Sequence, residues 1–349
     1  MSTRFFVLGS FSVAGCPPFA GLVLDEQVVA VDALQPLCER LGQPLCGSKS
    51  VLELLEHWEQ NLRALQRAVE VLSLESAHPA ATPELSWQPL EALHVHAPVL
   101  YPRQVFCAGA NYRQHVIELA VAQGHGAHDQ TDEDERRALA ERIMDARIAN
   151  GQPYVFTKIP SAITGPYDPI FLPADSQQVD WELELGVVIG KAARHVRRDQ
   201  ALDYVAGYTI VNDLTCRDRV YRPDLQAIGS DWLRSKCPPG FLPSGPFLVP
   251  ASFVPDPQRL HLTLKLNGQV MQDEGTDDMI FGVARLIEYI SHYVQLWPGD
   301  LICTGSPRGN GMHYQRFLQP GDVLEGSISG LGTQRNRCLA EEESPGRAR

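Results

Sequence analysis

The chain has 349 residues, of which 44% are apolar and 21% charged, as in ordinary soluble globular proteins. Its formal net charge of −12 argues against nucleic acid and an anionic membrane surface as partners. No run of about 18 apolar residues occurs, so no membrane span is predicted. Eight scattered cysteines without Cys-x-x-Cys spacing, and a start without a signal-peptide pattern, predict a cytoplasmic protein with reduced thiols.

The chain is longer than a usual single domain, and its residue pattern changes along its length. Residues 1–78 combine short strand patterns with apolar residues at helical spacing over 51–72, which predicts a small α+β N-terminal domain. Beyond it we expect a linker over 79–97, a strand-rich second domain over 98–339 and a disordered tail over 340–349.

Two helices are predicted inside the strand-rich part. The first spans 131–150, because Thr131-Asp132-Glu133-Asp134 has the pattern of a capping box and Asn150-Gly151 is a helix-ending signal. The second spans 277–296, where apolar residues recur at helical spacing. Elsewhere in this part, frequent Gly and Pro indicate turns between short strands.

A β-strand is predicted at Asp180-Trp181-Glu182-Leu183-Glu184-Leu185, because polar and apolar residues alternate there before an apolar run. The strand period of two places Asp180, Glu182 and Glu184 on one face. Carboxylates repeated on one face beside a core are costly unless a positive charge lies between them. A hard divalent cation such as Mg²⁺ meets that requirement, and a solvated edge face is the alternative.

A histidine and a glutamate stand three residues apart in Gly109-Ala110-Asn111-Tyr112-Arg113-Gln114-His115-Val116-Ile117-Glu118. On a helical turn His115 and Glu118 share a face, so the carboxylate can orient or polarise the imidazole. Such a pair can take a proton from water near neutral pH. An ordinary surface pair at this spacing is the alternative.

Three later segments also carry chemistry-bearing residues. An apolar strand ends on Asn212-Asp213, where the carboxylate is able to complete a metal site or simply to begin a turn. Lys236 stands alone among apolar and Pro residues. A further strand enters the Gly-rich loop 304–311, whose backbone N–H groups and Thr304 hydroxyl are suited to holding a carboxylate. The loop lacks the Gly-Lys-Ser/Thr of a nucleotide-binding P-loop.

In this order the segments resemble the fumarylacetoacetate hydrolase family, over about 97–338. The residues that match the family's motifs are Gly109, Asn111, Tyr112, His115 and Glu118; Phe156-Thr157-Lys158 with Gly165-Pro166; Glu182 and Glu184; Asp213; Arg217-Asp218; Lys236; Asn267-Gly268 with Met271-Gln272; Thr304 to Gly309; Pro320-Gly321-Asp322; and Gly330-Leu331-Gly332.

The resemblance implies an α+β, mostly β fold: a rolled mixed β-sheet catalytic domain preceded by a small α+β domain. It also implies a homodimer and a Mg²⁺ ion, or Mn²⁺ or Ca²⁺ in its place. The roles that it implies are metal ligation by Glu182, Glu184 and Asp213; catalysis by His115, Glu118 and Lys236; and substrate binding by Tyr112, Arg217, Gln272, Thr304 and Gly305.

The activity implied by the resemblance is hydrolysis of a C–C bond in an acylpyruvate or 2,4-diketo acid, with water activated by His115 and Glu118. A decarboxylase, tautomerase or hydratase of a 2-oxo acid is the alternative with the same metal site, and a metal-dependent binding protein without turnover is a third. The chain departs from the family at Val220, around Lys236, and over 120–151, which is interpreted as an insertion in the lid.

Overall fold

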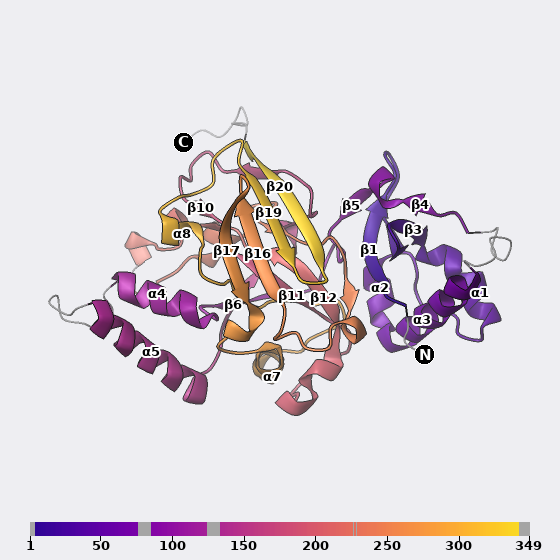
Figure 1. Cartoon of the computed structure of the whole chain (residues 1–349), viewed down its shortest axis with the longest axis horizontal. Coiled ribbons are helices and arrows are strands. Elements are labelled where there is room, and N and C mark those ends of the chain that lie inside the picture. Colours follow the sequence, from indigo (N-terminus) through magenta and orange to yellow (C-terminus); the bar gives the residue numbers. More distant parts are fainter. Residues whose placement is uncertain (1–3, 76–84, 124–132, 226, 228, 342–349) are drawn as a thin grey trace.

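The N-terminal part of the chain forms a β-sheet flanked by helices (Figure 1). The computed structural model describes residues 4–75, 85–123, 133–225, 227 and 229–341. The strands of this sheet, in spatial order, are β4 (Gln88–Pro89), β3 (Gln27–Ala30), β2 (Phe19–Leu24), β1 (Val7–Ser12) and β5 (His94–His96). The helices are η1 (Val31–Leu34), α1 (Gln35–Arg40), α2 (Val51–Glu56) and α3 (Trp58–Glu75).

The N-terminal unit differs from its sequence prediction in two places. Strands β4 and β5 lie within the predicted linker 79–97, yet they pair with β3 and β1 and therefore complete the N-terminal sheet. The helix predicted over 51–72 is present as two helices, because the backbone leaves the helical region at His57. The α+β character of the N-terminal region is as expected.

A mixed sheet forms the centre of the second unit. In spatial order its strands are β15 (Val249–Pro250), β12 (Val205–Asn212), β11 (Leu183–Ile189), β18 (Leu301–Cys303), β6 (Val105–Gly109) and β7 (Tyr154–Lys158). Only β18 and β6 pair in parallel within this described sheet. Every residue of β11 and β12 is buried, because these strands lie at the middle of the sheet and both of their faces are covered.

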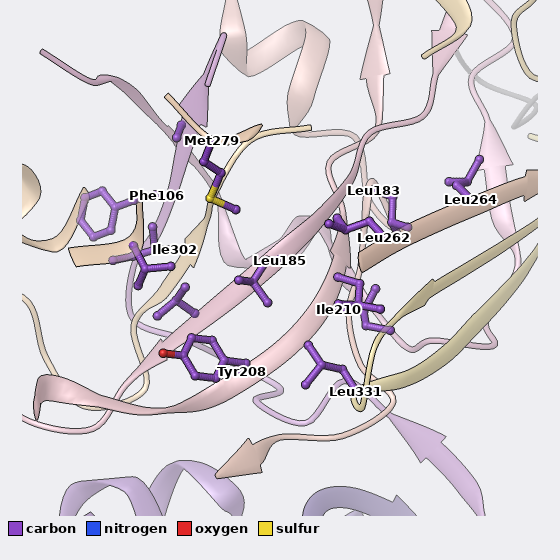
Figure 2. Packing of buried hydrophobic residues seen from close by; sticks show 14 of the residues in the cluster. Phe106, Leu183, Leu185, Tyr208, Ile210, Leu262, Leu264, Met279, Ile302 and Leu331 are labelled. Atoms are coloured by element: carbon purple, nitrogen blue, oxygen red, sulfur yellow. The ribbon is translucent and has the colours of Figure 1, made fainter. Parts of the chain in front are cut away.

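A second sheet packs on the first. Its order is β17 (Gln269–Gly275), β16 (His261–Leu266), β19 (Val323–Ile328), β20 (Gly332–Ala340) and β9 (Ile170–Leu172). Apolar side chains of Leu183 and Ile210 from the central sheet meet Leu262 of β16 in the core between the sheets (Figure 2). The fold is therefore α+β and mostly β, as predicted.

Helices and short strand pairs complete the second unit. They are β8 (Ile163–Thr164), β10 (Val179–Asp180), β13 (Thr215–Cys216), β14 (Leu242–Pro243), α4 (Arg113–Gln123), α5 (Glu133–Asn150), α6 (Trp232–Lys236), α7 (Val283–Tyr293) and α8 (Gly311–Tyr314), with short 3₁₀ turns η3 (Pro160–Ala162), η4 (Arg198–Tyr204), η5 (Arg217–Arg219), η6 (Pro223–Leu225), η7 (Ala251–Phe253) and η8 (Thr276–Asp278). The 3₁₀ turn η2 (Leu90–Ala92) lies between β4 and β5 of the N-terminal sheet. Within the described part of the chain, no helix has the length and apolarity needed to cross a bilayer.

The predicted helices of the second unit are found with altered ends. Helix α5 covers the predicted range 131–150 from Glu133 onward, and residues 131 and 132 lie outside the described ranges. Helix α7 is shorter than the predicted 277–296, because Gly282 is extended and Val294 returns to the β region. Helices α4 and α5 pack together at the end of the molecule opposite the N-terminal sheet (Figure 1). Ala340, predicted in the tail, is the last residue of β20, and 342–349 lie outside the described residues.

Candidate metal centre and active site

Three carboxylates converge where two central strands meet. Strands β11 and β12 run antiparallel, with Leu183 opposite Asn212, so Glu182 and Asp213 extend from the same end of the pair. The Asp213 N–H donates to the Glu182 carbonyl oxygen at 2.8 Å, which holds the two ends together. Carboxylate oxygens of Glu182, Glu184 and Asp213 lie within 4.8 Å of one another.

Basic side chains surround these carboxylates. Lys236 Nζ donates to Glu182 Oε2 at 2.6 Å and to Asp213 Oδ2 at 2.7 Å. Lys158 Nζ donates to Asp213 Oδ1 at 2.5 Å, and Arg217 Nη2 donates to Glu182 Oε1 at 2.5 Å. The ion pairs of Lys158 and Lys236 with Asp213 are buried, and that of Arg217 with Glu182 is partly buried, so these charge-assisted hydrogen bonds fix their partners in place.

Asp180 joins the same network but is not among the converging three. Its Oδ2 accepts from Arg217 Nε at 2.8 Å, and its Oδ1 accepts from the Gly311 N–H at 2.5 Å. The strand is interrupted at residues 181–182, between β10 and β11, so the alternation predicted from Asp180 onward is not continuous. We call Lys158, Asp180, Glu182, Glu184, Asp213, Arg217 and Lys236 the charged centre.

Glu184 is the least compensated carboxylate of the charged centre. Its Oε2 accepts from the Gly305 N–H at 2.7 Å, and no Lys or Arg side chain among the described residues forms an ion pair with it. Burial, followed by the nearby Asp213, raises the pKa of Glu184 well above its usual value. Glu182 behaves oppositely: burial raises its pKa, but Lys236 and Arg217 outweigh burial and lower it to about 2.

The charged centre has one more acidic side chain than basic side chains, so its charges favour a bound cation. It combines four carboxylates with three basic side chains, and all of the converging donor atoms are carboxylate oxygens. Oxygen-only donor sets suit hard cations such as Mg²⁺, Mn²⁺ and Ca²⁺ rather than Zn²⁺, which favours nitrogen and sulfur. The residues present thus fit the divalent ion expected from the sequence.

Helix α4 carries His115 and Glu118, but the two side chains have different surroundings. Burial lowers the pKa of His115 to about 4; Glu182 opposes the shift, while Arg217 and His313 add to it. The imidazole is therefore neutral at pH 7. Glu118 Oε1 lies 3.3 Å from Arg308 Nη1, and its Oε2 lies 3.2 Å from His313 Nδ1.

The predicted pairing of these two residues is not observed. No hydrogen bond joins His115 to Glu118 within the described ranges, because Glu118 is turned toward the segment that contains Arg308 and His313. Spacing on a helix places two side chains on one face, but it does not decide which partner each one chooses. Whether Glu118 takes part in catalysis stays a prediction.

The sequence model described as "Fumarylacetoacetate (FAA) hydrolase C-terminal" matches residues 104–339, which is well over half of the chain. The chain belongs to this family. It is 34% identical over 293 residues to the human mitochondrial oxaloacetate tautomerase FAHD2B, covering 83% of this chain and 80% of that protein. It is 44% identical over 189 residues to a 2,4-didehydro-3-deoxy-L-rhamnonate hydrolase of a Sphingomonas species, covering 53% and 65%.

Among solved structures, a fumarylacetoacetate hydrolase from Exiguobacterium antarcticum superposes with a TM-score of 0.69 at 27% identity, covering 96% of this chain and 100% of that one. The family resemblance and the fold expected from the sequence are thereby confirmed. The named relatives include hydrolases and tautomerases, so the fumarylacetoacetate hydrolase family to which this chain belongs contains enzymes of more than one reaction type.

Three residues predicted to bind substrate use their polar atoms within the protein. Gln272 Oε1 accepts from the Leu183 N–H at 3.1 Å, and its Nε2 donates to Ser306 Oγ at 2.9 Å. The Thr304 hydroxyl donates to the Leu185 carbonyl at 2.9 Å, and Gly305 holds Glu184. These contacts join the Gly-rich loop to β11, so they position a carboxylate of the centre.

Tyr112 has a different environment. Its hydroxyl is buried and has no hydrogen-bond partner among the described residues. Burial and the neighbouring Glu184 raise the pKa of this phenol well above its usual value, so it stays protonated. An unpaired buried O–H beside the charged centre is free to donate to a bound molecule.

Some site residues escaped the sequence analysis. Lys158 was noted only as part of a motif, although it forms the buried ion pair with Asp213. Asn111 donates to the carbonyl oxygens of Phe281 and Thr304 and thereby ties the start of α4 to the Gly-rich loop. The Phe156-Thr157-Lys158 motif was the available signal for the first, and the motif asparagine was the signal for the second.

Proposed function

We propose that this protein is a divalent-metal-dependent hydrolase that cleaves a C–C bond in an acylpyruvate or a related 2,4-diketo acid. The observation that carries the proposal is the convergence of Glu182, Glu184 and Asp213 beside the neutral His115. A family relative named as a hydrolase supports the reaction type.

Glu182, Glu184 and Asp213 would hold the ion, with Mg²⁺ as the expected occupant. When bound, such an ion acts as a Lewis acid that stabilises negative charge developing on a substrate oxygen. Lys236 and Arg217 add positive charge at the same place, which favours binding of the carboxylate end of a 2-oxo acid. The unpaired Tyr112 hydroxyl is a further donor for a substrate oxygen.

His115 is the proposed general base. Its low pKa keeps the imidazole neutral at pH 7, so it is able to accept a proton from water. The resulting hydroxide adds to the distal carbonyl carbon, and the C–C bond to the pyruvate portion breaks. The bonding electron pair remains on the pyruvate portion, which then takes up a proton. The products are a carboxylic acid and pyruvate.

Acetylpyruvate tests this function directly. The purified protein with Mg²⁺ or Mn²⁺ is expected to release acetate and pyruvate in equal amounts, and a chelator is expected to stop the release. Glu184→Gln serves as the inactive control, and the partly exposed Glu325→Gln as the control that retains activity. Failure to release acetate from acetylpyruvate and from longer acylpyruvates, with the metal bound, would refute hydrolysis.

Tautomerisation of a 2-oxo acid is the second candidate. Two observations favour it: relatives named as oxaloacetate tautomerases match most of the chain, and Glu118 is paired with Arg308 and His313 rather than with His115. Moving a proton between carbon and oxygen requires no activated water. Enol-to-keto conversion of oxaloacetate, followed by absorbance, measures this activity, while released CO₂ would instead indicate decarboxylation.

The homodimer and the cytoplasmic location stay predictions. Light scattering of the purified protein measures the first, and microscopy of a tagged protein in its native cell measures the second. For both the hydrolase and the tautomerase, the proposed binding partner is a small 2-oxo or diketo acid.

A further inference from the structure

Strand β7 connects the charged centre to the protein surface. Tyr154, Phe156 and Lys158 alternate along this strand and therefore share one side of it. The Lys158 side chain is fully buried on Asp213, Phe156 is half-buried, and Tyr154 is 48% exposed. The same side of the strand thus changes from a buried ammonium group to an exposed aromatic ring.

Helix α6 packs beside strand β7. Trp232 and Lys236 are four residues apart on this helix, so they lie on one face. Lys236 Nζ lies 5.3 Å from the centroid of the Phe156 ring, within reach of a cation–π contact. The Trp232 indole stacks on Phe156: the ring centroids lie 4.7 Å apart, with 17° between the ring planes.

The three rings hold one another in place. Trp232 Nε1 donates to the Tyr154 hydroxyl at 2.9 Å, so the indole N–H has its partner without a ligand. Asp231 accepts from the Arg234 N–H at the start of α6 and from Arg222, which fixes the helix that carries Trp232. We call Tyr154, Phe156 and Trp232 the aromatic shelf. It is partly exposed and begins at the lysine that contacts both Glu182 and Asp213.

The chemistry of the shelf is complementary to that of the charged centre. Lys236 is bound to Glu182 and Asp213 and also lies over the Phe156 ring, so a ligand that is held at the charged centre and extends along β7 and α6 would meet Phe156 and Trp232. Partly exposed, mutually fixed aromatic rings offer apolar area at a low entropy cost, and they favour another flat apolar group in stacked or edge contacts. A polar or very small group would leave the aromatic shelf exposed to water.

We propose that the aromatic shelf binds the distal acyl substituent of the substrate, and that this substituent is planar and apolar, such as an aryl group. The inference rests on the proposed function, because it assigns the far end of the same 2,4-diketo acid. It makes Trp232 the main specificity-determining residue, with Phe156 and Tyr154 as its supports.

Benzoylpyruvate and acetylpyruvate differ only in this substituent. The wild-type protein with Mg²⁺ is expected to have the higher kcat/KM for benzoylpyruvate. In Trp232→Ala the ratio of the two kcat/KM values should fall by about tenfold to a hundredfold, the range that apolar pocket contacts provide. Trp232→Phe keeps a stacking ring and should retain most of the ratio. Leu233→Ala, which alters the exposed neighbour on α6, should leave both substrates unchanged.

An equal loss for both substrates in Trp232→Ala would overturn the proposal, because it would make the shelf merely structural. If neither substrate is cleaved, the proposed function fails, and calorimetry with Mn²⁺ then tests the shelf alone. Tighter binding of benzoylpyruvate than of acetylpyruvate by the wild type, lost in Trp232→Ala and kept in Trp232→Phe, supports the shelf. Equal affinities in the wild type refute it.

Discussion

The charged centre and helix α4 contribute to the same candidate site, yet they are held by different kinds of interaction. The centre is built on strands β11 and β12, which are buried throughout, and its Lys158–Asp213 ion pair is fully buried. Helix α4 is attached at its start by the Arg113–Asp145 ion pair and by the Gln114 N–H, which donates to Asp278 at 2.9 Å, and farther along by the ion pair of Glu118 with Arg308. Those ion pairs are partly exposed to solvent.

Because they are held differently, the charged centre and helix α4 should respond differently to substitution. Removing a buried charge leaves its partners uncompensated, which costs much more than breaking an exposed ion pair. Substitutions in the centre should therefore abolish metal binding and turnover together, whereas substitutions on α4 should act on the rate and leave ligand binding intact. Four experiments test that contrast.

Glu184→Gln should have the largest effect. Among the described residues, Glu184 is the carboxylate of the centre without a basic partner, so Glu184→Gln removes a proposed metal ligand while leaving the ion pairs of Lys236 and Arg217 in place. Turnover should fall by about 10⁴-fold, since a bound metal supplies several kcal/mol of stabilisation. Calorimetry with Mg²⁺ should show weakened binding while circular dichroism stays unchanged. Wild-type turnover at limiting metal would contradict the assignment.

His115→Gln should lower kcat by about 10³-fold, within the usual range for loss of a general base. Binding of oxalate with Mn²⁺, measured by calorimetry, should stay close to the wild-type value, because oxalate engages the ion and needs no base. A loss of oxalate binding would show that α4 helps to position the ligand, and the contrast between centre and helix would then be wrong.

The three carboxylates that we propose as metal ligands were predicted from the sequence because they lie where local patterns point. Glu182 and Glu184 alternate with buried apolar residues, and Asp213 directly ends the neighbouring strand, so pairing of two adjacent strands suffices to join them. Their partners are not local. Lys158 is 55 residues from Asp213, and Arg308 is 190 residues from Glu118. Only the folded chain decides those pairings.

The fold shows the same division. The strand-rich, mostly β second unit follows from alternating and continuous apolar runs, which are properties of neighbouring residues. The short strands β4 and β5 have little pattern of their own, and they exist because β3 and β1 offer unpaired edges. A stretch containing Pro and Ala therefore looked like a linker in the sequence and is part of a sheet in the structure.

The pH dependence of stability tests the burial of His115. The pKa of this residue is about 4 in the folded protein against 6.5 ordinarily, so between these pH values only the unfolded chain binds a proton there. The free energy of unfolding should therefore decrease as the pH falls from about 6.5 toward 4. Urea unfolding at pH 7 and pH 5 should show a smaller decrease for His115→Gln than for wild type, while the exposed His57→Gln should behave as wild type.

Glu118→Gln should have the smallest effect. It tests whether the glutamate acts on His115 or only pairs with Arg308 and His313. Its side chain is 20% exposed, and its ionic partners Arg308 and His313 are 49% and 41% exposed. Ion pairs of this kind contribute at most about 1 kcal/mol, so kcat should change by less than about tenfold. Arg308→Gln should give a similar change. If Glu118→Gln instead lost as much rate as His115→Gln, the carboxylate would have to act on the imidazole during turnover, and the hydrolase would be favoured over the tautomerase.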